Sequence, residues 1–428
     1  MVNNENNFPF ADVLQKGLGR AFNYVKQLDE LEIRDDLLNA CLHNLAYDAQ
    51  CESRSAKWLF ELIHLTGNSE FYRDKIFTAL PTTNDFWDLK QLYDLVLIWA
   101  KQGNLEAKEI IYRTYEKQEL NESWLGGEQI IKLDGIDGLL AVADIFGAKL
   151  LEDHELGEDN SLINIACESY GSTKVKSTLE KEALNNINIK AYLNAVKSSE
   201  ENYGDFKRNR NKNKKIELDY IMQKIEQKKS SFYIFNRFGI NATHAEIEQI
   251  FYLLSKETRK KQLCRYLWIF KNRAFPKLDN RLFDLAASDD EELQYFAIAA
   301  LANNKSNSLH DLAIKLIQQQ PKSIDNRVLS LFINNYQSGD FKTIESVLTS
   351  SQDIDFRHYA GMDLIKIIDA QNNPELIDCA LWVYEYTPCS HCRHEILKIL
   401  IDTQQTTSNI LEECLHDCCP DIRALVNV

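Results

Sequence analysis

The sequence predicts an all-α fold, an α-solenoid built from stacked antiparallel helix pairs. Three observations lead to this fold class. Glycine and proline number only 15 and 7 in 428 residues, whereas an all-β chain needs many turns that use them. Apolar residues, 44% of the chain, recur at the spacing of helix faces. Near the C-terminus a helix-pair pattern also returns every 30–36 residues, which is typical of a solenoid.

The N-terminal part contains amphipathic helices that repeat less regularly. One apolar stripe consists of Ala56, Leu59, Phe60 and Ile63. A second consists of Leu89, Leu92, Tyr93, Val96, Trp99 and Ala100. Gly67 and Gly103 follow these stripes at the positions of helix C-caps, where glycine adopts a left-handed conformation easily. We therefore expect further helix pairs of about 35–40 residues here.

Two stretches interrupt this pattern. We interpret Gly126–Gly147 and the acids after it as a polar helix start followed by a charged loop, rather than as a cation site. The segment 207–215 carries six basic residues in nine and no apolar residue, which predicts an exposed loop or linker. The predicted division is an N-terminal helical repeat region (1–206), a basic linker (207–229) and a C-terminal repeat region (230–428).

The C-terminal third has the clearest helical period. One stripe consists of Leu293, Phe296, Ala297, Ala300 and Leu301, and the next of Leu309, Leu312, Ala313, Leu316 and Ile317. Ser288 and Glu291 match a capping box, which predicts a helix start at this point. A short polar connection between the stripes predicts an αα-hairpin.

A set of residues, which we call the ladder, recurs at the same position in successive predicted hairpins. It consists of Gln294, Arg327, Arg357, Arg393 and Arg423, each just inside a predicted helix start. An acidic residue precedes most of them by two positions, which ordinary helix-dipole chemistry would also favour.

The Asp-x-Arg ladder and its period resemble those of HEAT repeats, most specifically over 285–428, and the chain resembles uncharacterised bacterial HEAT-repeat proteins. The resemblance implies that acid and arginine join neighbouring repeats, where bidentate pairing is possible. We therefore assign Arg327, Arg357, Arg393 and Arg423 to cohesion between repeats and not to ligand contact.

A basic region with interleaved aromatic residues spans 207–273. Cations beside stacking rings suit single-stranded nucleic acid or an acidic partner, although a solvated linker beside ordinary core aromatics explains the same pattern. The candidate binding residues are Lys207, Arg208, Arg210, Lys212, Lys214, Lys215, Arg259, Lys260, Lys261 and Arg265.

Cysteines gather near the C-terminus at a spacing that resembles structural zinc sites. The candidate ligands are Cys389, Cys392, Cys414 and Cys418. The repeat register argues against a shared metal, because it places Cys389 and Cys419 at equivalent positions of stacked helices, about 10 Å apart. A buried thiol is also a normal core residue. We favour plain packing, expect no cofactor and keep the zinc site as the alternative.

The net charge, the apolar segments and the cysteine spacing of the chain restrict the classes of function that are possible. The net charge of −15 disfavours nucleic-acid binding by the whole surface. The chain has no apolar run of about 18 residues and no signal-peptide pattern, and its ten cysteines are irregularly spaced, so we expect a cytoplasmic protein without membrane contact.

The leading hypothesis is a non-enzymatic scaffold or adaptor that binds a protein or peptide on the concave face of the solenoid. The alternative is nucleic-acid binding through 207–273, as in HEAT-like DNA glycosylases. None of that family's catalytic residues can be placed on this sequence, so we assign no catalytic residue. An accessory role like that of HEAT-type chromophore lyases rests on the repeat type alone.

Overall fold

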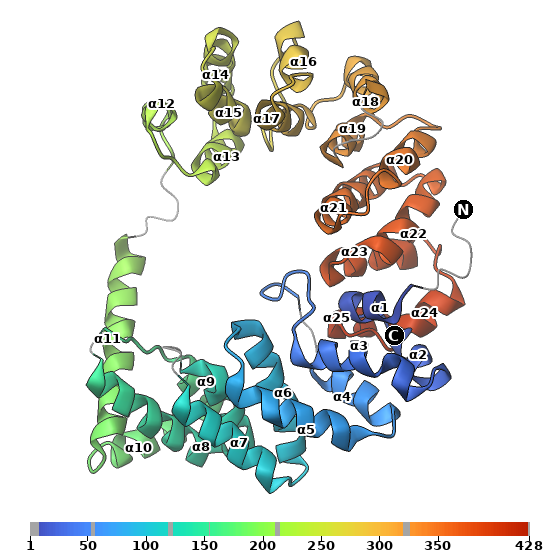
Figure 1. Cartoon of the computed structure of the whole chain (residues 1–428). Helices are drawn as coiled ribbons and strands as arrows, with labels where there is room; N and C mark the ends of the chain where they lie inside the picture. Colours follow the sequence, from blue (N-terminus) through green and yellow to red (C-terminus); the bar gives the residue numbers. More distant parts are fainter. Residues whose placement is uncertain are drawn as a thin grey trace. The chain divides into compact units, whose positions relative to one another are not determined.

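The computed structural model describes residues 8–52, 56–118, 123–153, 155–209, 215–319 and 326–426. Every regular element within these residues is a helix, and no strand occurs among them (Figure 1). The predicted all-α class is therefore confirmed. In the same residues, no helix is both long and apolar enough to cross a membrane.

The chain forms two compact units. Unit 1 is built mainly from Asn213–Leu411, and unit 2 from Phe8–Lys212 together with Glu412–Arg423. The helices of unit 2 are α1 (Phe10–Lys16), α2 (Ala21–Gln27), α3 (Glu30–Leu42), α4 (Ala56–Leu65), α5 (Ser69–Ala79), η1 (Leu80–Thr82), α6 (Phe86–Lys101), α7 (Leu105–Lys117), α8 (Trp124–Glu152), α9 (Ser161–Tyr170), α10 (Ser172–Glu182) and α11 (Ile187–Asn209).

The helices of unit 1 are α12 (Leu218–Glu226), α13 (Phe232–Asn241), α14 (His244–Lys256), α15 (Lys260–Ile269), α16 (Asn280–Ala286), α17 (Glu291–Leu301), α18 (Asn307–Gln319), η2 (Asn326–Leu331), α19 (Phe332–Asn335), α20 (Phe341–Leu348), α21 (Ile354–Gln371), η3 (Pro374–Leu376), α22 (Ile377–Tyr386) and α23 (Ser390–Asp402). Two further helices, α24 (Ser408–Cys414) and α25 (Pro420–Val426), each contribute residues to both units.

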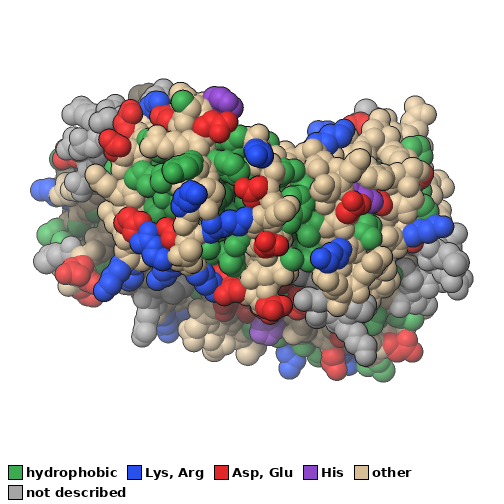
Figure 2. All heavy atoms as spheres, turned by 90° about the horizontal axis from the view of Figure 1, so that it is seen from above, with side chains coloured by type: hydrophobic (Ala, Val, Ile, Leu, Met, Phe, Trp, Pro, Cys, Tyr) green, Lys and Arg blue, Asp and Glu red, His purple; other side chains and the backbone are tan. Residues whose placement is uncertain are grey.

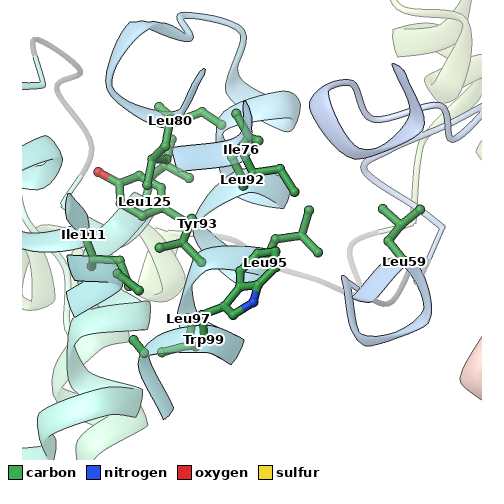
Figure 3. Packing of buried hydrophobic residues seen from close by; sticks show 14 of the residues in the cluster. Leu59, Ile76, Leu80, Leu92, Tyr93, Leu95, Leu97, Trp99, Ile111 and Leu125 are labelled. Carbon is green, nitrogen blue, oxygen red and sulfur yellow. The ribbon is translucent and has the colours of Figure 1, made fainter. Parts of the chain in front are cut away.

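The core of unit 2 takes apolar side chains from every helix from α1 to α11. The predicted stripe of α6 lies in this core, where Leu92 and Tyr93 are fully buried (Figure 3). Gly103 ends α6 in a left-handed conformation with φ 92°, and the next residue, Asn104, donates its N–H to the carbonyl of Trp99. Gly103 therefore ends the helix as expected, one residue after the C-cap Gln102, because this bond satisfies a terminal carbonyl of the helix.

The segment 412–423 completes unit 2. The guanidinium of Arg20 holds the carboxylate of Glu413 in a two-pronged pair, with both N–O distances 2.9 Å. The indole N–H of Trp58 donates to the backbone carbonyl of His416 at 2.8 Å. The sequence had placed this segment with the C-terminal repeats, whereas its side chains pack among helices near the other end of the chain.

Unit 1 consists of two rows of helices (Figure 1). Row A contains α13, α15, α17, η2 with α19, α21 and α23, and each of these packs against the next in the row. Row B contains α14, α16, α18, α20 and α22, which pack against row A. Within row A, every helix between the two ends of the row therefore contacts both of its neighbours in the row.

The ladder residues lie near the starts of their helices, and Arg423 belongs to unit 2 whereas the others belong to unit 1. Gln294, Arg357, Arg393 and Arg423 are each the fourth residue of their helix, and Arg327 is the second residue of η2. The sequence register therefore located the first turn of five successive elements.

One predicted helix start is wrong by two positions. The N-cap of α17 is Asp290, whose carboxylate accepts the N–H of Leu293 at 3.0 Å. Ser288, predicted as the N-cap, lies outside the helix and accepts the N–H of Asp290 at 3.2 Å. Aspartate is as good an N-cap as serine, so the residue nearer the helix takes the role.

Two other stretches also differ from expectation. Gly126–Gly147 lies inside α8, a long helix kinked at Gly135, where φ is 66°. The helix is longer than a helix start, whereas the acidic residues Asp153, Glu155, Glu158 and Asp159 lie in a non-helical connection between α8 and α9, as predicted. Helix α11 runs to Asn209, so residues 207–209 are helical, whereas they were predicted to begin a linker.

Candidate functional site

The predicted basic surface is described only in part. Lys207 and Arg208 belong to the last turn of α11. Outside the described residues lie Arg210, Lys212 and Lys214. Lys215 is described, and its Nζ lies 2.9 Å from an Oε1 of Glu246.

Arg259 is engaged by acidic side chains of its own unit. Its guanidinium lies 2.7 Å from a carboxylate oxygen of Glu226 and 2.7 Å from one of Glu257. The hydrogen bond from the Arg259 side chain, with backbone hydrogen bonds from Arg259 and Thr258, lowers the pKa of Glu257 to about 2. Lys261, next along the helix after Lys260, is exposed.

Arg265 is buried and caps a helix rather than facing solvent. Only 5% of the residue is exposed, and its Nη1 donates to the carbonyl of Gln227 at 2.7 Å, just after α12 ends. Arg273 does the same for α13, donating to the carbonyl of Gly239 at 3.0 Å. Such contacts satisfy the carbonyls that a helix C-terminus leaves open, so Arg265 has a structural role here.

Lys260 joins neighbouring helices of row A. Its Nζ lies 2.7 Å from Asp290 and 3.0 Å from Glu292, at the start of α17. Glu292 is the first acid of the predicted ladder, and its cationic partner is this lysine. Charge therefore does link α15 to α17, through a residue that was proposed as a ligand contact.

The first two ladder arginines lie against aromatic rings. Arg327 is 4.9 Å from the ring of Tyr295 on α17, and Arg357 is 5.6 Å from the ring of Tyr386 on α22. Both distances suit a cation–π contact. These two arginines therefore contact other helices of unit 1 through ring faces.

The last two ladder arginines differ in burial. Arg393 is completely buried within α23. Arg423 is half-buried and donates from Nη1 to the backbone carbonyl of Asp417.

A cluster of two thiols and an imidazole lies where α21 and α23 begin. It consists of His358, Cys389 and Cys392, whose ligating atoms all lie within 4.8 Å of one another. The Nδ1 of His358 is 3.8 Å from the Sγ of Cys392. Hydrogen bonds from Cys392 and His358 lower the pKa of the Cys389 thiol to about 4. This pair of cysteines belongs to the predicted four-cysteine set.

The other two predicted ligands lie in a different place. Cys414 and Cys418 are buried in the 412–423 segment of unit 2, and the N–H of Cys418 donates to the carbonyl of Gly17 at 2.9 Å. Cys418 is part of the unit 2 hydrophobic core. Neither belongs to the His358 cluster, which is the metal-ligand group found among the described residues.

Sequence reasoning missed His358, although a signal was present. The repeat pattern aligns residues at matching positions of successive helix pairs. Such residues lie far apart when the helices stack. His358 follows the ladder residue Arg357 by one, whereas Cys389 and Cys392 precede Arg393 by four and by one. The three residues occupy different positions near the starts of α21 and α23, which are neighbours in row A. A comparison of such positions would have suggested that they lie together.

Unit 2 contains a cavity of about 340 Å³ beside α3, α4 and α6. Two of its polar lining residues already have partners, and the amide of Gln91 donates to three backbone carbonyls, at Ala40, Cys41 and His43. Asp94 on the same wall is paired with Lys90 at 2.8 Å. The cavity therefore offers no convergent set of polar groups to a ligand.

No protein-family model, curated protein or solved structure matches this chain.

Proposed function

We propose that the chain is a HEAT-like α-solenoid scaffold that binds a protein or peptide partner along row A of unit 1. The packing of each row A helix on the next supports this arrangement. Solenoids of this type present the equivalent faces of successive helices as one extended binding surface.

The observation that carries the proposal is the distribution of exposed apolar side chains. Among the described residues of α13–α23, the large apolar side chains exposed on row A are Tyr233, Ile240, Ile354, Tyr359 and Met362, whereas row B exposes one, Tyr252. Figure 2 shows hydrophobic side chains at the surface among basic and acidic ones. Exposed Tyr and Met are enriched at protein interfaces.

Half-buried rings beside cations extend this surface along row A. Lys271 lies 4.2 Å from the ring of Trp268, and Trp268 lies 5.8 Å from Tyr295. Arg327 covers the other ring of this pair. Aromatic and arginine side chains held in place in this way lose little conformational entropy when a partner binds.

Nucleic-acid binding receives less support from the contacts. Arg259 and Lys260 are paired with carboxylates, and Arg265 is buried. Phosphate binding would have to break these pairs. A gel-shift assay at varied salt tests this alternative, because true phosphate contacts weaken steeply as salt rises.

The test places a photo-crosslinking amino acid at one position per variant in the cell that makes the protein. Tyr359 and Tyr233 sample row A, and Tyr252 is the matched control on row B, since these side chains are 53%, 69% and 62% exposed. We expect one discrete protein adduct from Tyr359 or Tyr233 and none from Tyr252. Adducts of equal yield from all three positions, or adducts only from Tyr252, would contradict the proposal.

A further inference from the structure

Consecutive helices of row A bring three metal-binding side chains together. His358 is the fifth residue of α21, Cys389 is the N-cap of α23, and Cys392 lies in the first turn of α23. The helices pack directly on each other. Both cysteines are buried and the histidine is half-buried, so the three side chains are largely shielded from solvent but solvent still reaches the histidine.

We propose that His358, Cys389 and Cys392 bind a zinc ion that ties α21 to the start of α23. Tetrahedral zinc has Zn–S distances of about 2.3 Å and Zn–N distances of about 2.0–2.1 Å, which place neighbouring ligand atoms roughly 3.5–3.8 Å apart. The 3.8 Å between the Nδ1 of His358 and the Sγ of Cys392 meets this requirement. All three ligand atoms lie within 4.8 Å, so small side-chain rotations complete the set.

The donor set selects the metal. Two thiolates and an imidazole favour zinc over magnesium or calcium, which prefer oxygen ligands. Both cysteines bind the ion as thiolates, so their protonation weakens binding at acidic pH. Three protein ligands leave the fourth tetrahedral position to water or to a donor from outside the trio.

The arrangement is specific to these cysteines. Cys379 on the adjacent helix α22 is also buried, but no group of three metal ligands in the described residues includes it. Buried Cys414, one of the ligands suggested by the sequence, is likewise outside the group. These two residues therefore provide matched controls, because each loses a buried thiol without losing a proposed ligand.

The first experiment measures zinc in the full-length protein. We expect one zinc per chain by elemental analysis after purification under reducing conditions, and thiolate-to-metal charge-transfer absorption when cobalt replaces zinc. Cys389→Ser, Cys392→Ser and His358→Ala should each weaken zinc binding by about 100-fold or more, since even residues that only orient a ligand cost 10–100-fold. Cys379→Ser and Cys414→Ser should bind zinc as the unchanged protein does.

A second measurement needs no variant and so does not depend on whether the variants fold. Zinc should protect Cys389 and Cys392 from alkylation, as read by mass spectrometry of the peptides, and a chelator should remove the protection. Cys51, which is exposed, should react in both states.

Three results would overturn the proposal. The first is zinc content below one per chain with no protection of the two thiols. The second is a Cys389–Cys392 disulfide that forms in air and does not respond to zinc, which would indicate a redox pair. The third is loss of zinc in Cys414→Ser together with unchanged binding in His358→Ala, which would restore the four-cysteine set.

Discussion

At the residue scale, Glu158 shows how burial changes the chemistry of a side chain. It lies between α8 and α9 and is only 7% exposed. Burial raises the pKa of its carboxyl group to about 7, although hydrogen bonds from Ser123 and Tyr192 act to lower this pKa. The hydroxyl of Tyr192 lies 3.3 Å from the carboxyl. The sequence suggested a charged loop here, because an acidic run says nothing about which member is turned inward.

We predict that Glu158→Gln removes a pH dependence of stability. The folded-state pKa lies above the usual value of 4.5, so the contribution of Glu158 to stability is fully present below pH 4.5 and is lost as the pH rises through 7. Glutamine mimics the neutral acid, so the variant should be more stable at pH 8 by up to about 3 kcal/mol, since one pKa unit equals about 1.4 kcal/mol. Urea unfolding at pH 5 and pH 8 measures the difference.

The control for this prediction is Glu155→Gln, because Glu155 is an exposed acid of the same segment. It should leave the pH dependence unchanged. A Glu158→Gln protein that lost stability equally at both pH values would show that the carboxyl is charged in the folded state.

At the element scale, helices α13 and α15 of unit 1 pack closely against each other at a glycine. A Cβ on Gly239 of α13 would lie 1.8 Å from the backbone oxygen of Ile269 at the end of α15. The same region is held by Arg273, which donates to the carbonyl of Gly239. The sequence showed this region only as basic with interleaved aromatic residues, and the close approach follows from the packing of one helix on the other.

We predict that Gly239→Ala destabilises unit 1, although alanine is the better helix former by about 1 kcal/mol. The methyl group forces α13 away from α15, and overpacking of this kind costs about 1–3 kcal/mol or more. Thermal unfolding monitored by circular dichroism should show a lower midpoint.

The matched variant is Gly157→Ala. Nothing lies within 4 Å of the Cβ that it would add, so its effect should stay within about 0.5 kcal/mol. An unchanged midpoint for Gly239→Ala would mean that α13 does not pack on α15 at this distance.

At the scale of the whole molecule, the chain leaves unit 2 near residue 212 and returns to it at residue 412. The returning segment brings the ion pair of Arg20 with Glu413 and the hydrogen bond from Trp58. It also stacks His416 on Phe22, with ring centres 5.1 Å apart. Unit 2 is therefore assembled from the first half of the sequence and a short piece near its end.

We predict that a chain ending at Leu411 contains a less stable unit 2. Loss of the buried ring contact and of the two-pronged ion pair should lower the unfolding midpoint of unit 2 by roughly 5–10 °C, because about 1 kcal/mol shifts a domain of this size by 2–4 °C. A synthetic peptide of residues 412–428 added to the shortened chain should restore part of the loss. The same midpoint with and without the segment would refute this account.

The sequence by itself determined the all-α class, the buried stripe of α6 and the first turns that carry Gln294, Arg357, Arg393 and Arg423. These features depend on the spacing of neighbouring residues, because 3.6 residues per turn decides which side chains share a face. Only the tertiary structure placed His358 beside Cys389 and Cys392, turned Glu158 inward and joined residues 412–423 to unit 2. Such placements depend on how distant helices pack, and packing depends on the shapes of whole surfaces rather than on a local pattern.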